Sequence, residues 1–134
     1  MKRFSLAIAI TTILCASAAL AERTDRSDTV AIGQLKRILF RGNYGEACRS
    51  AGPPIFRLIS RPLLGEVTTE ITDYKVPSGE RCENTMQPGL AVWYKAGPKA
   101  GTDIFKYTIE YPHEANNRAP SKGPQPVTQT ITVK

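Results

Sequence analysis

The chain has 134 residues and a formal charge of +6, and its basic residues are spread along its length. This length suits a single domain. A mild, dispersed charge argues against a nucleic-acid partner, which would need a basic face or stripe. The sequence also contains no recognised enzyme motif, so no catalytic residue and no enzymatic activity are predicted.

The first 21 residues have the three parts of a secretory signal peptide. Two basic residues open the chain, an apolar run follows at 4–14, and alanine stands at positions 19 and 21. We expect cleavage before Glu22, which would remove Cys15, leave no stable membrane span and give a periplasmic or secreted product. An uncleaved membrane anchor is the alternative.

Removal of this leader leaves two cysteines, Cys48 and Cys82. An even number of cysteines in an oxidising compartment predicts a disulfide. A redox pair or a metal site is the alternative, but the spacing is not C-x-x-C, and zinc would need two more ligands although the chain has one histidine. We therefore expect a structural disulfide, no metal and no cofactor.

The remaining chain is predicted to form strands. Residues 22–28 are charged and are expected to be a flexible N-terminus before a domain at 29–134. Within that domain apolar and polar side chains alternate with period two, which is typical of strands with one buried face. The predicted strands are 29–32, 35–40, 55–59, 67–72, 90–95, 103–111 and 127–134. With Gly- and Pro-rich turns between them, this pattern predicts a β-sandwich of about seven strands, with a small barrel as the alternative.

The alternation also predicts which side chains face the core. One face of each of the four clearest strands carries Val67, Thr69 and Ile71; Leu90, Val92 and Tyr94; Phe105, Tyr107, Ile109 and Tyr111; and Val127, Gln129, Ile131 and Val133. The same pattern places Trp93 on the opposite face of its strand.

Residues 89–109 read GLAVWYKAGPKAGTDIFKYTI and resemble the signature of bacterial immunoglobulin-like (cadherin-like) repeats. The residues that match by type and spacing are Tyr94, Gly97, Gly101, Asp103, Phe105, Tyr107 and Ile109. PLLGEV at 62–67 and TQTITVK at 128–134 are similar to two other strands of these repeats. The resemblance implies one copy of an immunoglobulin-like β-sandwich, and no calcium ligation is inferred from it.

Three of the matching residues are predicted to form a structural turn. Gly97 and Gly101 would allow positive φ in a tight loop between two strands. Asp103 is expected to accept backbone N–H bonds within that loop, as Asp often does in turns. A metal-binding or catalytic Asp103 is the alternative reading.

Two features are candidate binding surfaces. The first is the polar segment 112–126, which is longer than most hairpin connections. The second is Trp93, which could anchor a protein or a sugar ring if it is exposed, or be covered by a neighbouring loop. The candidate binding residues are Trp93, His113, Asn116, Asn117 and Arg118.

The sequence thus predicts a non-enzymatic, secreted or periplasmic immunoglobulin-like domain. Its expected role is binding or accessory structure at the bacterial envelope, with an envelope protein or a cell-surface glycan as partner. The alternative is a secreted inhibitor of a hydrolase, such as a protease or lysozyme, that acts through the 112–126 loop.

Overall fold

The computed structural model describes residues 24–111, 124 and 126–134, and the regular elements of these residues are all strands. They are β1 (Thr24–Val30), β2 (Leu35–Gly42), β3 (Ile55–Ser60), β4 (Gly65–Lys75), β5 (Met86–Ala96), β6 (Gly101–Glu110) and β7 (Pro126–Val133). No helix of the described ranges could cross a membrane, since none there is long and apolar enough.

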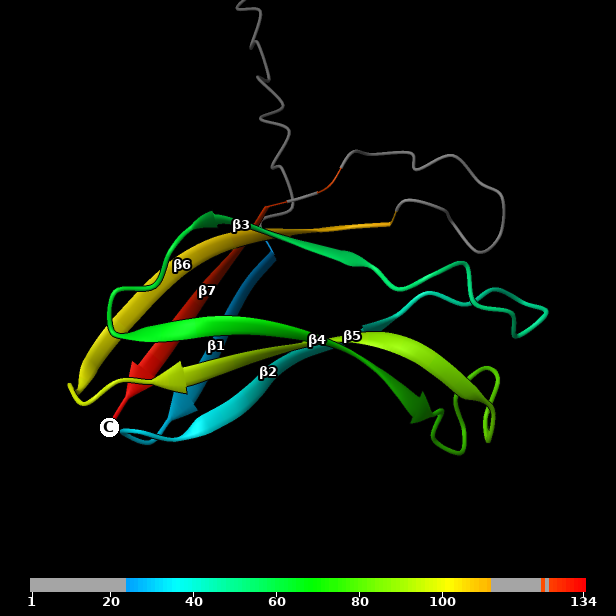
Figure 1. Cartoon of the computed structure of the whole chain (residues 1–134), viewed down its shortest axis with the longest axis horizontal. Coiled ribbons are helices and arrows are strands. Elements are labelled where there is room, and N and C mark those ends of the chain that lie inside the picture. The colour runs from blue at the N-terminus through cyan, green and yellow to red at the C-terminus, as the bar shows by residue number, and fades with distance from the viewer. Residues whose placement is uncertain (1–23, 112–123, 125) are drawn as a thin grey trace, which may run out of the picture.

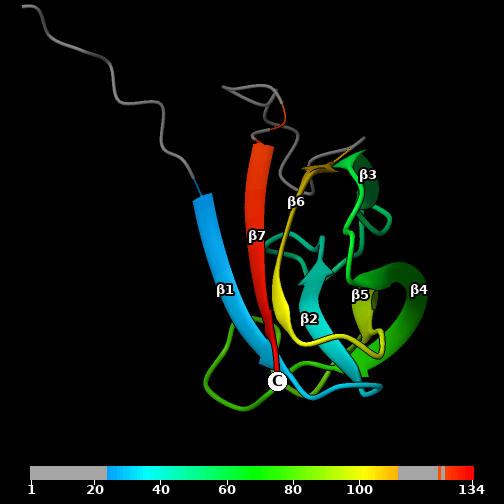
Figure 2. The same ribbon diagram turned by 90° about the vertical axis from the view of Figure 1, so that its left-hand side faces the viewer.

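The strands form two sheets that pack as the two layers of a sandwich (Figure 1). One sheet has the order β1-β7-β6-β3 and the other β2-β5-β4. The six strands from β2 to β7 are distributed between the layers as strands B to G of an immunoglobulin domain are, while β1 runs parallel to β7 beside it (Figure 2). The predicted immunoglobulin-like β-sandwich of about seven strands is therefore confirmed.

The core lies between the two sheets and follows the predicted alternation closely in the central strands. Its buried side chains are Val30, Ile38, Leu39, Leu90, Val92, Tyr94, Ala96, Phe105, Tyr107, Ile131 and Val133. Gln129 is also buried on the core face of β7. In β4 the predicted face is the inner one, because Val67, Thr69 and Ile71 are paired with the core residues Tyr94, Val92 and Leu90, yet Thr69 and Ile71 are exposed. Tyr111, which lies just beyond β6, is also exposed. β4 is an edge strand, so a side chain on its inner face is not necessarily covered by the other layer.

The prediction of a flexible segment at 22–28 was wrong for residues 24–28, which belong to β1. Two of their charged side chains, Arg26 and Asp28, bond to the neighbouring strands. Asp28 forms a 2.9 Å ion pair with Lys36 of β2 and accepts a 3.1 Å hydrogen bond from the Gln129 amide of β7. Arg26 donates from Nη2 to the carbonyl oxygen of Ile38 at 3.4 Å. These bonds join the first strand to both layers.

A bulge interrupts β2 at Ile38. Arg37 is paired with Trp93 and Leu39 with Val92, so the two β2 residues Ile38 and Leu39 are matched to one step of β5. Both Ile38 and Leu39 are buried in the core. A bulge of this kind changes the face on which all following residues of the strand lie.

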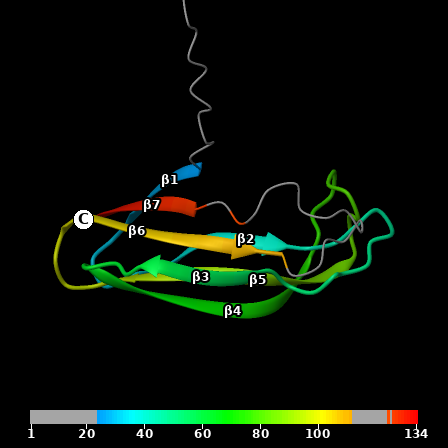
Figure 3. The ribbon, with the colours of Figure 1, turned by 90° about the horizontal axis from the view of Figure 1, so that it is seen from above.

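One end of the sandwich carries a disulfide between two connections. The segment 43–54 joins β2 to β3, the segment 76–85 joins β4 to β5, and Figure 3 shows both at the same end. Cys48 and Cys82 link them with a Cα separation of 5.4 Å, which confirms the predicted pair. The Gln87 amide adds a 2.9 Å hydrogen bond to the carbonyl oxygen of Cys48. The two connections are therefore held together covalently and by hydrogen bonding.

Candidate functional site

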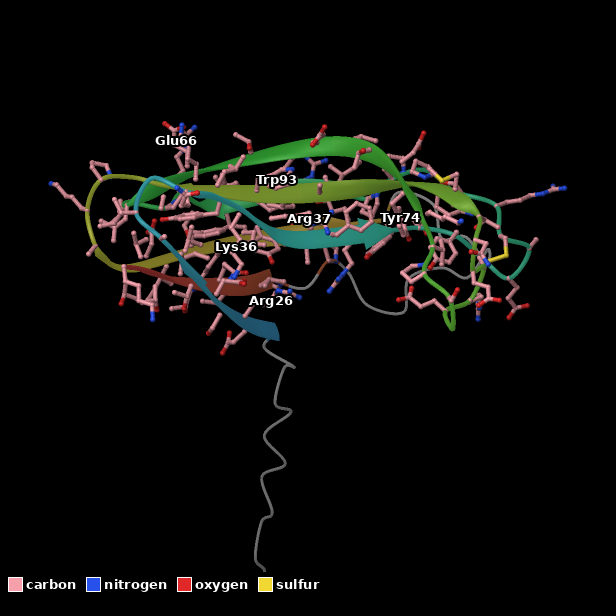
Figure 4. All side chains as sticks on the ribbon, turned by 90° about the horizontal axis from the view of Figure 1, so that it is seen from below. Arg26, Lys36, Arg37, Glu66, Tyr74 and Trp93 are labelled. Carbon is pink, nitrogen blue, oxygen red and sulfur yellow. A yellow bond between two sulfur atoms is a disulfide. The ribbon has the colours of Figure 1, made fainter. Side chains whose placement is uncertain are left out.

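The outer face of the β2-β5-β4 sheet carries aromatic and basic side chains, and Figure 4 looks onto this sheet. Trp93 lies on it, on the face opposite Leu90, Val92 and Tyr94 as predicted, and is half-buried. In the register of the sheet Trp93 stands between Arg37 of β2 and Thr68 of β4. Trp93 is thus partly exposed and lies among side chains of its own sheet.

An open depression of about 680 Å³ lies beside Trp93, toward the disulfide-bearing end. Its volume is within the range of small-molecule and peptide sites. Three aromatic and three basic residues line it, and we call it the aromatic–basic pocket: Arg37, Phe40, Arg41, Tyr44, Tyr74 and Lys75. Glu80 is the acidic residue among its lining. None of these residues was predicted from sequence as a site residue.

Arg37 and Phe40 meet in this pocket because of the β2 bulge. The register pairs Arg37 with Trp93 and Phe40 with Ala91, which lie two residues apart on β5 and so share its outer face. The Arg37 guanidinium carbon lies 5.2 Å from the centre of the Phe40 ring, within the range of a cation–π contact. Without the extra residue, Phe40 would fall on the opposite face of β2.

Two glycines make room for the aromatic rings. A Cβ atom on Gly89 of β5 would collide with the Phe40 ring, and one on Gly42 would lie 2.7 Å from the Tyr74 hydroxyl oxygen. The Phe40 and Tyr74 rings therefore rest directly on backbone. They contact each other edge to face, with centroids 4.5 Å apart and planes at 77°.

Tyr74 is held in place at its polar end as well. Partial burial raises the pKa of Tyr74, and a hydrogen bond with Tyr44 raises it further. Tyr44 lies in the segment 43–54, which contains Cys48, whereas Tyr74 lies near the end of β4. The two phenols therefore join the pocket to one of the disulfide-linked connections.

The basic groups of the pocket are not neutralised by ion pairing. The ion pairs found among residues 24–111, 124 and 126–134 are Lys36–Asp28 and Arg57–Glu110, and neither includes Arg37, Arg41 or Lys75. These three side chains are exposed, and Arg41 donates a 2.9 Å hydrogen bond to the carbonyl oxygen of Phe40. Arg41 is paired with the core residue Leu90, so its side chain lies on the opposite face of β2 from Arg37 and Phe40.

Asp103 and its two glycines were predicted as a turn, and their geometry differs from that expectation. Asp103 is 1% exposed and accepts backbone N–H bonds from Leu63 at 2.8 Å and Leu64 at 2.9 Å, in the connection from β3 to β4 rather than in its own loop. Its third bond, at 2.7 Å, comes from the Tyr94 hydroxyl. Burial and this bond raise the pKa of Tyr94. Asp103 therefore ties a remote loop and the opposite sheet to β6.

Only one of the two glycines has positive φ. Gly101 has φ of +148°, as expected, but Gly97 does not have positive φ. Gly97 instead donates a 2.8 Å backbone hydrogen bond to Leu64, and a Cβ at Gly97 would lie 2.6 Å from the Leu64 carbonyl oxygen. Its small size permits that close approach of two loops.

The other candidate binding residues, His113, Asn116, Asn117 and Arg118, lie outside the described residues, as does most of the 112–126 loop. In the described part of the chain no group of three or more His, Cys, Asp and Glu side chains is placed to hold a metal ion. The site therefore has to be judged from the aromatic–basic pocket and its surroundings.

No family model matches the sequence, and no curated protein matches it either. Two solved structures are similar in fold. One is amebosin in solution, with a TM-score of 0.47, 16% identity, and coverage of 84% of this chain and 98% of that one. The other is PbICP-C in complex with falcipain-2, with a TM-score of 0.41, 13% identity, and coverage of 84% and 89%.

Proposed function

We propose that this protein is a non-enzymatic binding module that grips a partner protein with the aromatic–basic pocket and the disulfide-linked connections beside it. The observation that carries the proposal is the pocket itself. It gathers partly buried aromatic rings and Arg37, which has no ion pair among the described residues, on a sheet face outside the core. Tyr and Arg are the residue types that most often dominate binding energy at protein interfaces.

The surrounding structure supports a preformed site. Phe40 and Tyr74 lie on glycine backbone, Tyr44 bonds Tyr74, and the disulfide fixes the adjoining connections. A site that is already ordered loses little conformational entropy when a partner binds. The leader and the disulfide fit a setting outside the cytoplasm, where the partner would be an envelope or extracellular protein.

Site-specific photo-crosslinking in the producing cell tests this proposal. A photoreactive amino acid at Lys75, at the pocket, should give one dominant cross-linked protein, to be identified by mass spectrometry. The same group at Lys99, which lies in the exposed connection from β5 to β6 at the other end of the sandwich, is the matched control. Equal cross-linking from both positions, or none from Lys75, would contradict a partner at the pocket.

A secreted inhibitor of a hydrolase is the second candidate. The disulfide holds segments 43–54 and 76–85 side by side, and β6 ends and β7 begins at this same end of the sandwich. Loops clustered on a rigid scaffold can enter the active site of another enzyme. A screen against proteases and lysozymes tests this role, with a variant whose residues 113–123 are replaced by Gly and Ser at equal length. Inhibition that survives the replacement would remove the predicted role of the 112–126 loop.

A further inference from the structure

The outer side of β4 has no neighbouring strand in the described part of the chain. β4 ends the β2-β5-β4 sheet, and it pairs with β5 without a register shift over all 11 residues from Gly65 to Lys75. An edge strand presents backbone N–H and C=O groups that can pair with another strand. A long and regular edge is therefore suited to the addition of a strand from another chain.

Among the described strands, the other three sheet edges carry features that oppose such pairing. β3 has only 6 residues and a register shift after Leu58, β2 has its bulge and three basic residues, and β1 has three charged residues. Short length, bulges and charges are the means by which edges avoid pairing. β4 in contrast reads VTTEIT at 67–72, with five β-branched residues, which favour strands, and one charge, Glu70.

An apolar side chain beside this edge is only partly covered. Ile71 is paired with the core residue Leu90, so it lies on the inner face of the sheet, yet it is 55% exposed. Leu58 of β3 is paired with the core residue Tyr107 and is also exposed. The two sheets therefore do not close over each other on the side of β3 and β4. A further strand next to β4 would cover the side of Ile71 that points away from β5.

We propose that β4 pairs antiparallel with β4 of a second copy of this chain, about a two-fold axis at Ile71. A two-fold axis makes an edge its own partner, so no second sequence is required. Each copy brings the same exposed Ile71 to the axis, where the two side chains lie opposite and cover each other. The two three-stranded sheets then form one continuous sheet of six strands.

The charges of β4 and its apolar side chain favour this register. An axis at Glu70 would set the two Glu70 carboxylates directly opposite each other, which is unfavourable. An axis at Thr69 would bring both Glu66 and Glu70 of the second copy beside Glu70, and an axis at Thr72 would set Ile71 opposite a carboxylate, that of residue 73. With the axis at Ile71, Glu70 lies opposite Thr72 and the apolar side chains meet.

Sedimentation of the protein purified from the producing cell measures the association, and the wild type should sediment as a dimer at high concentration. Ile71→Lys brings two ammonium groups together at the axis and should weaken the dimer at least about tenfold. Ile104→Lys is the matched control. Ile104 is 56% exposed and lies on β6 of the other sheet, so this variant should associate as the wild type does. Urea unfolding of both variants verifies that they remain folded.

Cysteine substitution tests the register. Cβ atoms directly opposite each other in an antiparallel pair lie about 4.5 to 5.5 Å apart, so Ile71→Cys should give a disulfide-linked dimer on mild oxidation. Thr69→Cys should not. With the axis at Ile71, the two residues 69 are offset by four positions along the strands, which is roughly 13 Å.

Three results would overturn the inference. They are a wild type that stays monomeric even at about 1 mM, equal weakening by Ile71→Lys and Ile104→Lys, and a disulfide-linked dimer from Thr69→Cys but not from Ile71→Cys. A monomer whose photoreactive group at Ile71 captures a different protein would assign the edge to a strand of that protein instead. The proposed function is tested separately, since mass spectrometry tells a second copy cross-linked at Lys75 from a partner protein.

Discussion

Arg37 and Phe40 are three residues apart on β2, yet both lie on the outer face of the sheet, with the guanidinium carbon 5.2 Å from the ring centre. Strict alternation would place them on opposite faces. The bulge at Ile38 brings them together and at the same time buries two consecutive apolar side chains in the core. One irregularity of a strand thus serves both stability and the candidate site.

Gly89→Ala tests how closely this arrangement is packed. The new methyl group would collide with the Phe40 ring, so we expect a loss of about 1 to 3 kcal/mol in the free energy of unfolding, measured with urea. In a Phe40→Leu background, whose side chain does not reach as far, the loss should be clearly smaller. The same loss in both backgrounds would show that Phe40 is not what the methyl group meets.

Asp103→Asn should destabilise the protein by about 2 to 4 kcal/mol. The buried carboxylate accepts three hydrogen bonds, and an amide group would turn a donor toward at least one of those donors. Asp73→Asn, at an exposed position of β4, makes the same chemical change and should cost less than about 0.5 kcal/mol. Comparable urea midpoints for the two variants would rule out the central role given to Asp103.

Removal of the hydroxyl group should lower the stability of the protein at Tyr94 but not at Tyr107, although both tyrosines are buried. The Tyr94 hydroxyl bonds Asp103, so Tyr94→Phe should destabilise by about 1 to 2 kcal/mol. The Tyr107 hydroxyl has no partner among the described residues and is fully buried, so Tyr107→Phe should be neutral or slightly stabilising. Thermal unfolding of the two variants measures the difference, and a loss at Tyr107 as large as that at Tyr94 would contradict it.

Stability should fall at alkaline pH. Burial raises the pKa of both Tyr94 and Tyr107 above the ordinary value of 10.0, so the folded state holds these protons more tightly than the unfolded state does. The stability contributed by each is therefore complete below about pH 10 and is lost as pH rises toward the folded-state pKa. One such group gives a slope of at most about 1.4 kcal/mol per pH unit.

Urea titrations between about pH 9 and 11 measure this slope. Tyr94→Phe should reduce it, since that variant has one raised pKa fewer. Ile131→Val, which trims a fully buried side chain but keeps every tyrosine, should lower stability and leave the slope unchanged. A slope that is the same in all three proteins would remove Tyr94 as its source.

The disulfide should contribute about 3 to 4 kcal/mol, as the chain-entropy model gives for cysteines 34 residues apart. Reduction, or the double change Cys48→Ser/Cys82→Ser, should lower the free energy of unfolding by this amount. Adding a reductant to the serine variant is the control and should have no effect. If the wild type is equally stable with and without reductant, the bond does not restrain the unfolded chain as the model assumes.

The central strands and the disulfide were predictable because they depend on local patterns. Simple alternation puts Phe105 and Tyr107 on one face of β6 and Tyr94 on one face of β5, and both faces are buried between the two sheets. Cys48 and Cys82 could be paired by count alone, given the predicted removal of Cys15 with a leader.

The first strand and the pocket could not be predicted in the same way. Asp28 looks solvated in the sequence, and its bonds to Lys36 of the next strand and to Gln129 of the last strand depend on how the strands are arranged in space. The pocket depends on the register between three strands, which no single segment encodes. The adjacent apolar residues Ile38 and Leu39 were the one local signal, because two buried neighbours in a strand indicate a bulge.

The parallel pairing of β1 with β7 has a consequence for biosynthesis. A ribosome makes residues 24–30 long before residues 126–133. During nearly all of translation, β1 therefore lacks β7, the strand to which it hydrogen-bonds in the folded protein. A nascent chain that lacks β7 also leaves Phe105 and Tyr107 without Ile131 and Val133 in the same layer. Such a chain exposes apolar surface and an open strand edge, which are the features that chaperones bind.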